Sequence, residues 1–181
     1  MARRELERYE SGNRVMLQLV VPSADYQASY ISYIAELGDE ERYPFPLDFD
    51  HSDFGVMLAQ IEAFRLGENI PEGYVPSSTF WLVRNSEIVG CTNVRHFLNA
   101  QIEHCGGHIG LSIRPSLRGH GLGVHLMQLS IAEARRLGND CIHIHCHAHN
   151  AASRALIEAS GGVLHSDVTV DGEKVLRFRV G

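Results

Sequence analysis

The sequence predicts a single domain of the α/β class, in which a central mixed β-sheet is flanked by helices. Three observations support this prediction. The 181 residues are enough for one domain with its own hydrophobic core. Apolar residues recur at helical spacing in some segments and form short or alternating runs, typical of strands, in others. The predicted strands outnumber the predicted helices, and short polar turns join several of them as hairpins, which disfavours a regular doubly wound sheet.

Proline, glycine and capping residues set the expected boundaries of these elements. Pro22 ends the first strand, Ser23 can cap the first helix, and Gly38 ends that helix. Asp171 and Gly172 form the strongest short turn signal in the chain and predict a hairpin. The expected elements, in chain order, are strand 15–21, helix 23–37, helix 54–66, strands 79–84, 88–97 and 108–113, helix 121–137, strand 141–147, helix 150–160, and strands 163–170 and 174–180.

Composition and charge exclude several classes of protein function. The formal net charge of −6 argues against a general nucleic-acid binder, which needs a basic surface to neutralise phosphates. No apolar run reaches the length of about 18 residues that a membrane-spanning helix needs, and residues 1–14 are interpreted as a polar lead-in rather than a secretory signal. The four cysteines form no C-x-x-C pair and are expected to be reduced. We therefore expect a cytoplasmic protein with one domain over residues 15–181.

The most informative segment is I-R-P-S-L-R-G-H-G-L-G, over residues 113–123, between a predicted strand and a predicted long helix. Glycines let backbone N–H groups approach an anion closely, and the N-terminus of a helix adds a favourable dipole. Arg118 can add a positive charge. The spacing fits neither a P-loop nor a dinucleotide-binding fingerprint. The segment therefore predicts a phosphate-binding loop, with a plain strand-to-helix turn as the alternative.

This segment resembles the pyrophosphate-binding motif of the GNAT superfamily of N-acetyltransferases. The downstream sequence also resembles that family, with a strand over 141–147, Asn150 at the start of a helix, and a glycine pair at 161–162. The stretch G-G-H-I-G-L-S-I-R-P-S further resembles a subgroup of predicted bacterial acetyltransferases. The resemblance covers roughly residues 15–180. It implies a GNAT-like fold, whose central sheet contains a parallel pair of strands that splay apart.

The resemblance also implies a binding site for acetyl-CoA as co-substrate, in the cleft between strands 108–113 and 141–147. Backbone groups at the end of the first strand would bind the pantetheine arm, as an added strand would. Amides of the glycine loop would hold the pyrophosphate, and the start of the last helix would contact the pantetheine. The implied cofactor-binding residues are Leu111, Ser112, Ile113, Arg118, Gly119, His120, Gly121, Leu122, Gly123, Asn150 and Ser153.

The implied reaction is transfer of an acetyl group from the thioester to a primary amine of an unidentified small molecule or peptide. The backbone N–H of Leu111 is expected to stabilise the oxyanion. Many family members carry a tyrosine as the proposed general acid where this chain has Ile157. In this chain the leaving thiolate would be protonated by water or by another group such as Ser153, or would leave without a general acid. The family often has a glutamate near the start of the splayed strand. We assign the general base to His108, with His96 as the next candidate and a purely local role for His108 as the alternative.

Four histidines, at 143, 145, 147 and 149, alternate with smaller or apolar residues. Strand geometry would place all four on one face. A His-x-His pair on a strand can bind zinc, but no cysteine or acidic residue lies at convincing ligand spacing. We therefore interpret the histidine ladder as the polar face of a strand and expect no metal. A metal-binding protein built on the ladder is the alternative.

Residues 36–72 contain ten acidic and two basic residues, interleaved with Tyr43, Phe45 and Phe49. By the resemblance this region lines the acceptor side of the cleft, where an acidic rim would attract a cationic amine. The alternative is a solvated helix face. Taken together, the sequence predicts a GNAT-type N-acetyltransferase without nucleic-acid or membrane partners, whose terminal hairpin could pair in a homodimer. A catalytically silent acyl-CoA-binding module or sensor is the alternative function.

Overall fold

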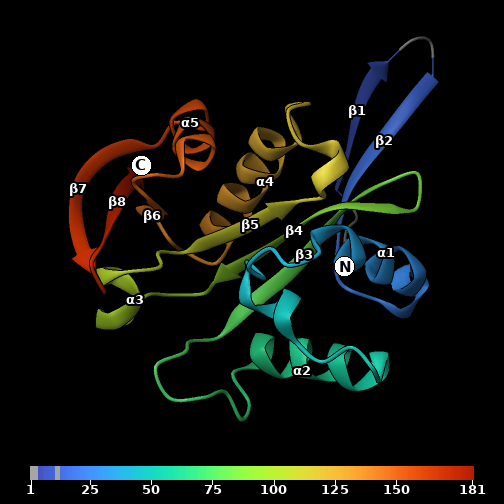
Figure 1. Ribbon diagram of the computed structural model, residues 1–181, viewed down its shortest axis with the longest axis horizontal. Helices are drawn as coiled ribbons and strands as arrows, with labels where there is room; N and C mark the ends of the chain where they lie inside the picture. Colours follow the sequence, from blue (N-terminus) through green and yellow to red (C-terminus); the bar gives the residue numbers. More distant parts are fainter. Residues whose placement is uncertain (1–3, 11–12) are drawn as a thin grey trace.

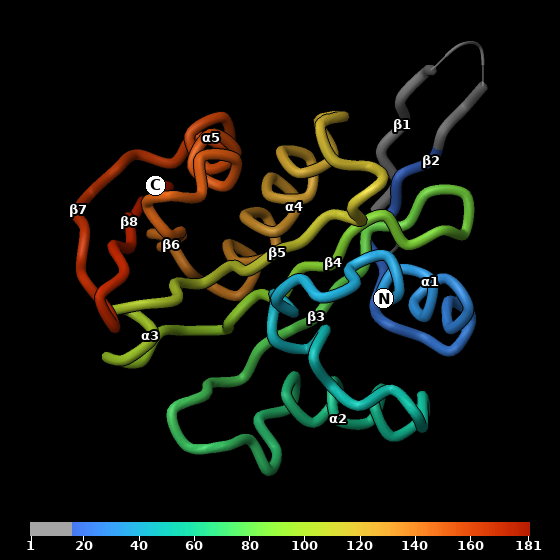
Figure 2. The backbone as a smooth tube through the Cα atoms, in the orientation of Figure 1, coloured from blue at the N-terminus to red at the C-terminus, as the bar shows by residue number. Residues whose placement is uncertain are grey.

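The computed structural model describes the secondary structure of residues 4–10 and 13–181, and the side chains from residue 16 onward (Figures 1 and 2). The strands are β1 (Arg4–Glu10), β2 (Asn13–Val20), β3 (Ser77–Arg84), β4 (Glu87–Arg95), β5 (Ile109–Ile113), β6 (Ile142–His147), β7 (Val163–Val170) and β8 (Glu173–Val180). The helices are α1 (Gln27–Leu37), α2 (Phe54–Leu66), α3 (Ala100–His104), α4 (Leu122–Arg136) and α5 (Ala151–Ala159), with short 3-10 turns η1 (Ala24–Tyr26), η2 (Phe45–Asp48) and η3 (Pro115–Leu117).

The strands form two sheets rather than one. The larger sheet has the order β1-β2-β3-β4-β5, and the smaller has the order β6-β8-β7. Strands β5 and β6 are therefore edge strands of different sheets, and the sheets meet along these edges (Figure 1). The predicted mixed α/β architecture is confirmed, and β5 and β6 share no ladder of hydrogen bonds, as expected of central strands that splay apart. The bridge that joins their segments, between Gly107 and Ile144, is antiparallel.

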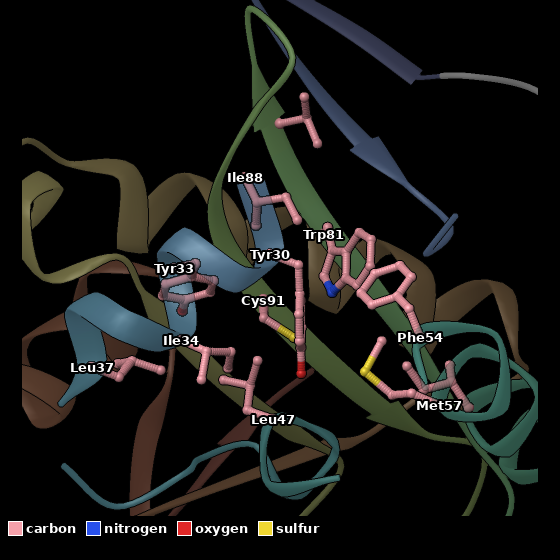
Figure 3. Packing of buried hydrophobic residues seen from close by; sticks show 12 residues of the cluster. Tyr30, Tyr33, Ile34, Leu37, Leu47, Phe54, Met57, Trp81, Ile88 and Cys91 are labelled. Carbon is pink, nitrogen blue, oxygen red and sulfur yellow. The ribbon is translucent and has the colours of Figure 1, made fainter. Parts of the chain in front are cut away.

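Helices cover both faces of the larger sheet (Figure 1). Helices α1 and α2 pack on one face, where Tyr30, Phe54 and Met57 surround the fully buried Trp81 (Figure 3). Helix α4 packs on the other face, where Leu126 contacts a cluster that includes Leu82 of β3. Because both faces are covered, β3 and β4 are buried almost throughout and lack the alternation of a half-exposed strand.

Two elements were not expected from the sequence. Strand β1 lies within the predicted lead-in and pairs antiparallel with β2. Its sequence, RELERYE, is mostly charged, which suits an edge strand and hides the apolar pattern of an ordinary strand. Helix α3 has only five residues, too few to show helical periodicity. Asn99 caps it by accepting a hydrogen bond of 2.9 Å from the N–H of Ile102.

Among the described helices, none is both long and apolar enough to cross a membrane.

Candidate active site

The candidate active site lies where β5 and β6 part. At their beginnings the two strands are held together: the N–H of His108 donates to the carbonyl of His143 at 2.7 Å, and the N–H of Gly106 donates to Nδ1 of His145 at 3.0 Å. Further along, β5 bonds to β4 while β6 bonds to β8. The two strands therefore open into a wedge. Gly107, which forms the bridge to Ile144 immediately before β5, has a positive φ of 70°, a conformation that glycine adopts easily.

The hydrogen-bond register of β5 decides which of its backbone groups face the wedge. The N–H of Arg95 donates to the carbonyl of His108 at 2.8 Å, and the N–H of Arg114 donates to the carbonyl of Val89 at 3.0 Å. Even-numbered residues of β5 therefore bond to β4, so Ser112 directs its backbone there. The backbone groups of Leu111 and Ile113 face the opposite side, which is the open side of the wedge, although the carbonyl of Ile113 already accepts a hydrogen bond of 3.1 Å from Nε of Arg118.

The glycine loop leads from η3 into the N-terminus of α4. Gly119 and Gly121 have φ of 80° and 77°, a left-handed conformation that glycine adopts easily. Gly121 is the N-cap of α4, and no side chain caps this helix. The exposed N-terminus therefore presents backbone N–H groups together with the positive end of the helix dipole. Gly123 lies between the end of β5 and α5, since a Cβ there would contact Leu156 at 3.4 Å and Ile113 at 3.8 Å.

The two arginines near the glycine loop are both paired with acids at the end of α1 and just beyond it. Arg118 forms a forked ion pair with Glu40, at 3.1 and 2.7 Å, and its hydrogen bonds lower the pKa of that carboxyl. Arg114 is buried, with 2 % of its surface exposed, and donates to Glu36 at 2.6 Å. Partial burial opposes ionisation of Glu36, but hydrogen bonds from Ser116 and Arg114 lower its pKa overall. These acids neutralise much of the expected positive charge, so anion binding at the loop depends mainly on backbone amides.

The start of α5 forms another wall of the site. Asn150 is its N-cap, and its Oδ1 accepts a hydrogen bond of 2.9 Å from the N–H of Ser153. The side chain of Ser153 is half-buried, whereas Asn150 is exposed. Ile157, at the position where the family often has a tyrosine, is 1 % exposed and belongs to the hydrophobic cluster between α4 and the smaller sheet. This helix therefore offers a capping amide and a hydroxyl.

His108 is held in place through both ring nitrogens. Its Nδ1 accepts a hydrogen bond of 3.0 Å from the N–H of His143. Its Nε2 must therefore carry the proton of the neutral ring, and it donates to Oδ1 of Asn139 at 3.1 Å. The ring is 4 % exposed, and burial lowers its pKa. The only lone pair of the ring is already engaged, so this geometry favours the alternative that His108 has a local structural role over its assignment as general base.

His96, the second candidate for the base, is half-buried at the end of β4. Its Nε2 lies 2.9 Å from Oγ of Ser78, and its carbonyl accepts a hydrogen bond of 3.1 Å from Asn139. Burial lowers the pKa of His96, so the ring is neutral at physiological pH. The side chain of Asn139 thus joins the segments that carry His96 and His108, beyond the C-terminal end of α4.

Tyr43 contacts the middle of β5 from the acidic segment. A Cβ at Gly110 would lie 2.8 Å from both Cζ and the hydroxyl oxygen of Tyr43, so only glycine leaves space for this ring. The hydroxyl thus lies beside the residue that precedes Leu111. Tyr43 is 41% exposed as a whole, but its hydroxyl end is buried against β5, which raises its pKa, while the charge of Arg95 opposes this shift. Sequence reasoning placed Tyr43 in a binding loop but missed its contact with the central strand, because the contact joins segments far apart in the chain.

The remaining aromatic residues of the acidic segment form a cluster of their own. The ring of Phe45 packs against Phe49, Phe64 and Tyr74, with ring centroids 5.7, 4.9 and 5.2 Å apart. This cluster joins η2 to α2 and to the loop before β3. Phe45 and Phe49 therefore contribute to packing, and Tyr43 is the aromatic residue of this loop that contacts β5.

The histidine ladder divides into two parts. His145 is buried, with 8 % exposed, and burial lowers its pKa to about 3. His143 is half-buried beside the ring of His108, with ring centroids 5.9 Å apart. His147 and His149 are exposed and stack on each other at the end of β6. The inner pair fits the structural interpretation of the ladder, whereas the outer pair lies beside Glu173 of β8.

A free strand edge beside a helix N-terminus with exposed amides suits an extended ligand that carries a phosphate group. The GNAT acetyltransferase family model matches residues 34–161, more than two thirds of the chain, so this protein belongs to the GNAT acetyltransferase family. It is therefore an acyltransferase of the acetyltransferase class. A search of curated proteins found no match.

Solved structures of other acetyltransferases share the fold. An acetyltransferase from Salmonella typhimurium that modifies the N-terminal serine of ribosomal protein L7/L12 has a TM-score of 0.65 and 14% identity, over 91% of this chain and 94% of that chain. The putative acetyltransferase yncA of the same organism, solved with acetyl-CoA, has a TM-score of 0.60 and 17% identity, over 91% and 92%. MccE, solved with acetyl-CoA and AMP, has a TM-score of 0.67 and 14% identity, over 91% of each chain.

Proposed function

We propose that this protein transfers an acetyl group from acetyl-CoA to a primary amine of a small molecule or peptide. The observation that carries this proposal is the wedge between β5 and β6, with the uncapped N-terminus of α4 at its end. The pantetheine arm would lie along the free edge of β5 and bond to the backbone of Leu111 and Ile113. The pyrophosphate would accept hydrogen bonds from the amides of residues 119–123, because the N–H of Arg118 already donates to the carbonyl of Pro115 at 3.2 Å.

The start of α5 would hold the other side of the pantetheine arm. Oδ1 of Asn150 caps the helix, and the amide nitrogen of a capping asparagine can still donate to a ligand. The hydroxyl of Ser153, one turn into the helix, is the proposed contact near the thioester. We also propose that this hydroxyl donates a proton to the leaving thiolate, because Ile157 cannot act as an acid.

The amine attacks the thioester carbonyl, and the C–S bond breaks as the thiolate of CoA leaves. The N–H of Leu111 faces the wedge and is our proposed donor to the oxyanion of the tetrahedral intermediate. The attacking amine must lose a proton, and water is the proposed acceptor of that proton, since the ring of His108 is engaged at both nitrogens.

The acceptor would approach on the face of β5 that Tyr43 covers. Glu36 and Glu40 are already paired with the loop arginines, so the acidic rim available to a cationic amine is smaller than the sequence suggested. Tyr43 supplies a hydroxyl beside Gly110, one residue from the proposed oxyanion donor. We propose that it orients the acceptor amine.

The experiment that tests this function is a screen for release of free CoA from acetyl-CoA. The acceptor panel contains small amines, amino acids and peptides with free N-termini, including an N-terminal serine peptide. We expect release that depends on one class of amine, with a product heavier by one acetyl group. Binding of acetyl-CoA without release across the whole panel would instead identify a silent acyl-CoA-binding module or sensor.

Location and assembly are also proposals. Acetyl-CoA is a substrate of the cell interior, and the four cysteines are free, which suits the reducing cytoplasm. Strand β7 is an edge strand of the smaller sheet, with Val163 and Leu164 70% and 46% exposed. We propose that this edge pairs with a second copy in a homodimer. Light scattering on the intact protein should give a mass of two chains. A charged substitution such as Val163→Lys should reduce the measured mass to that of one chain.

A further inference from the structure

Three exposed side chains at the end of β6 and the start of β8 take no part in the proposed acetyl transfer. They are His147, His149 and Glu173, and their potential ligand atoms all lie within 4.8 Å of one another. The rings of His147 and His149 stack, with centroids 5.3 Å apart and an interplanar angle of 21°. Nδ1 of His149 lies 3.4 Å from a carboxylate oxygen of Glu173. This arrangement brings two imidazoles and a carboxylate together on one surface.

The backbone fixes these three residues relative to one another. The N–H of Ala148, between the two histidines, donates to the carbonyl of Lys174, next to Glu173, at 2.8 Å. The N–H of Asn150 donates to the carbonyl of His147 at 3.0 Å, which forms the turn that carries His149. The cluster therefore rests on a sheet pairing and a hydrogen-bonded turn, so side-chain rotation alone can bring the ligand atoms together.

The chemistry of these three ligand side chains favours some metal ions over others. Two imidazoles and a carboxylate suit zinc, whereas magnesium and calcium prefer sites built only from oxygen ligands. A tetrahedral zinc ion has ligand bonds of about 2.0–2.1 Å, which places its donor atoms about 3.3 Å apart. The distance of 3.4 Å between Nδ1 of His149 and the carboxylate oxygen of Glu173 is already close to this spacing. The three side chains would leave one position for water.

We propose that His147, His149 and Glu173 form a zinc site, which ties the N-cap of α5 to the turn of the β7–β8 hairpin. Sequence reasoning found the His-x-His pair but no acidic partner, because the hairpin brings Glu173 to the pair from another strand. The site does not depend on the proposed acetyl transfer, so failure of one proposal leaves the other standing.

A second group of histidines in the same protein serves as a control for the proposed zinc site. His104, His143 and His165 line a pocket of 270 Å³ together with Arg177 and Arg179. Burial and the charge of Arg179 lower the pKa of His143, while Glu103, which also lines this pocket, opposes the shift. Two guanidinium groups repel a divalent cation, so this pocket is a poor zinc site despite its histidines.

The test is calorimetric titration of zinc chloride into the full-length protein after removal of metals by a chelator. We expect one equivalent of zinc to bind. His147→Ala and Glu173→Gln should each weaken binding at least about tenfold, whereas His165→Ala, a histidine of the pocket, should leave it unchanged. All three side chains are exposed, so these variants are expected to fold.

A second measurement on the same proteins is thermal unfolding with and without zinc. Zinc should raise the melting temperature of the wild-type protein and of His165→Ala, but not of His147→Ala, because binding to the folded state stabilises it. Magnesium should have no effect. Absence of zinc binding to the wild-type protein would overturn the proposal. Binding that survives both ligand substitutions, or that is lost in His165→Ala, would place the metal elsewhere and would also overturn it.

Discussion

At the scale of single residues, His108 and Tyr43 take their roles from contacts with distant segments of the chain. His108 has the residue type and the position of a general base, but its Nδ1 accepts a hydrogen bond from a backbone N–H and its Nε2 donates one to Asn139. Tyr43 lies in a segment without regular structure, yet its hydroxyl abuts the central strand. Sequence reasoning could name both residues, but only the fold assigns their partners, because those partners lie on other segments of the chain.

His108→Ala should therefore act on stability more than on turnover. The substitution removes two buried hydrogen bonds and leaves a cavity, so we expect a loss of about 2–4 kcal/mol in the free energy of unfolding. Urea denaturation measures that loss, and CoA release per folded molecule should stay near the wild-type rate. A large fall in turnover at unchanged stability would restore His108 as the base.

Tyr43→Phe removes the hydroxyl beside Gly110 and keeps the ring that packs there. We expect turnover with saturating acetyl-CoA to fall about tenfold, the equivalent of one hydrogen bond of about 1.4 kcal/mol. The Kd of acetyl-CoA should not change, because the proposed role concerns the acceptor. Calorimetry and steady-state kinetics separate the two effects, and weaker acetyl-CoA binding at unchanged turnover would contradict the proposed role.

At the scale of elements, the site depends on how the C-terminal end of α1, the glycine loop and α4 are joined. The pairs Arg114–Glu36 and Arg118–Glu40 fix the loop to the α1 segment. The glycine loop and the boundaries of α4 followed closely from the sequence, since glycine spacing and helical periodicity are local signals. The acids that neutralise the arginines could not be identified in this way, because the pairs form across the tertiary fold.

Gly121→Val should weaken acetyl-CoA binding at least about tenfold, because a β-branched residue disfavours the left-handed conformation that directs the first amides of α4. Gly138→Val is the matched control. Gly138, just beyond the other end of α4, also has positive φ, 92° against 77°, and neither position has an atom within 4 Å of an added Cβ. Both variants should lose similar stability, and equal loss of acetyl-CoA affinity in both would show that strain alone explains the effect.

At the scale of the whole molecule, two sheets meet at one pair of edges and diverge at the site. The sequence predicted the strands and the mixed α/β class. It did not predict the division into two sheets, because strand patterns do not specify which edges bond. Neither β1 nor α3 has a recognisable pattern, the first being highly charged and the second very short. The histidines between the sheets are buried in neutral form, which makes the stability of the whole molecule depend on pH.

The free energy of unfolding should fall as the pH drops below about 6.5. In the unfolded chain a histidine gains its proton near that pH, whereas burial holds the pKa of folded His145 at about 3. The unfolded state therefore binds more protons in this range, and each such histidine lowers stability by at most about 1.4 kcal/mol per pH unit. Urea denaturation across the range measures the slope. His145→Asn, whose amide oxygen can replace Nδ1 as acceptor, should flatten it, and an unchanged slope would count against His145 as a source.

The most direct test of the proposed acetyl-CoA site is an NMR titration of acetyl-CoA into protein labelled at its backbone amides. The largest shifts should occur at Leu111, Ile113 and residues 119–123, the amides that face the wedge and the N-terminus of α4. Absence of binding, or shifts centred on the pocket formed by His143, His165 and Arg177, would contradict it.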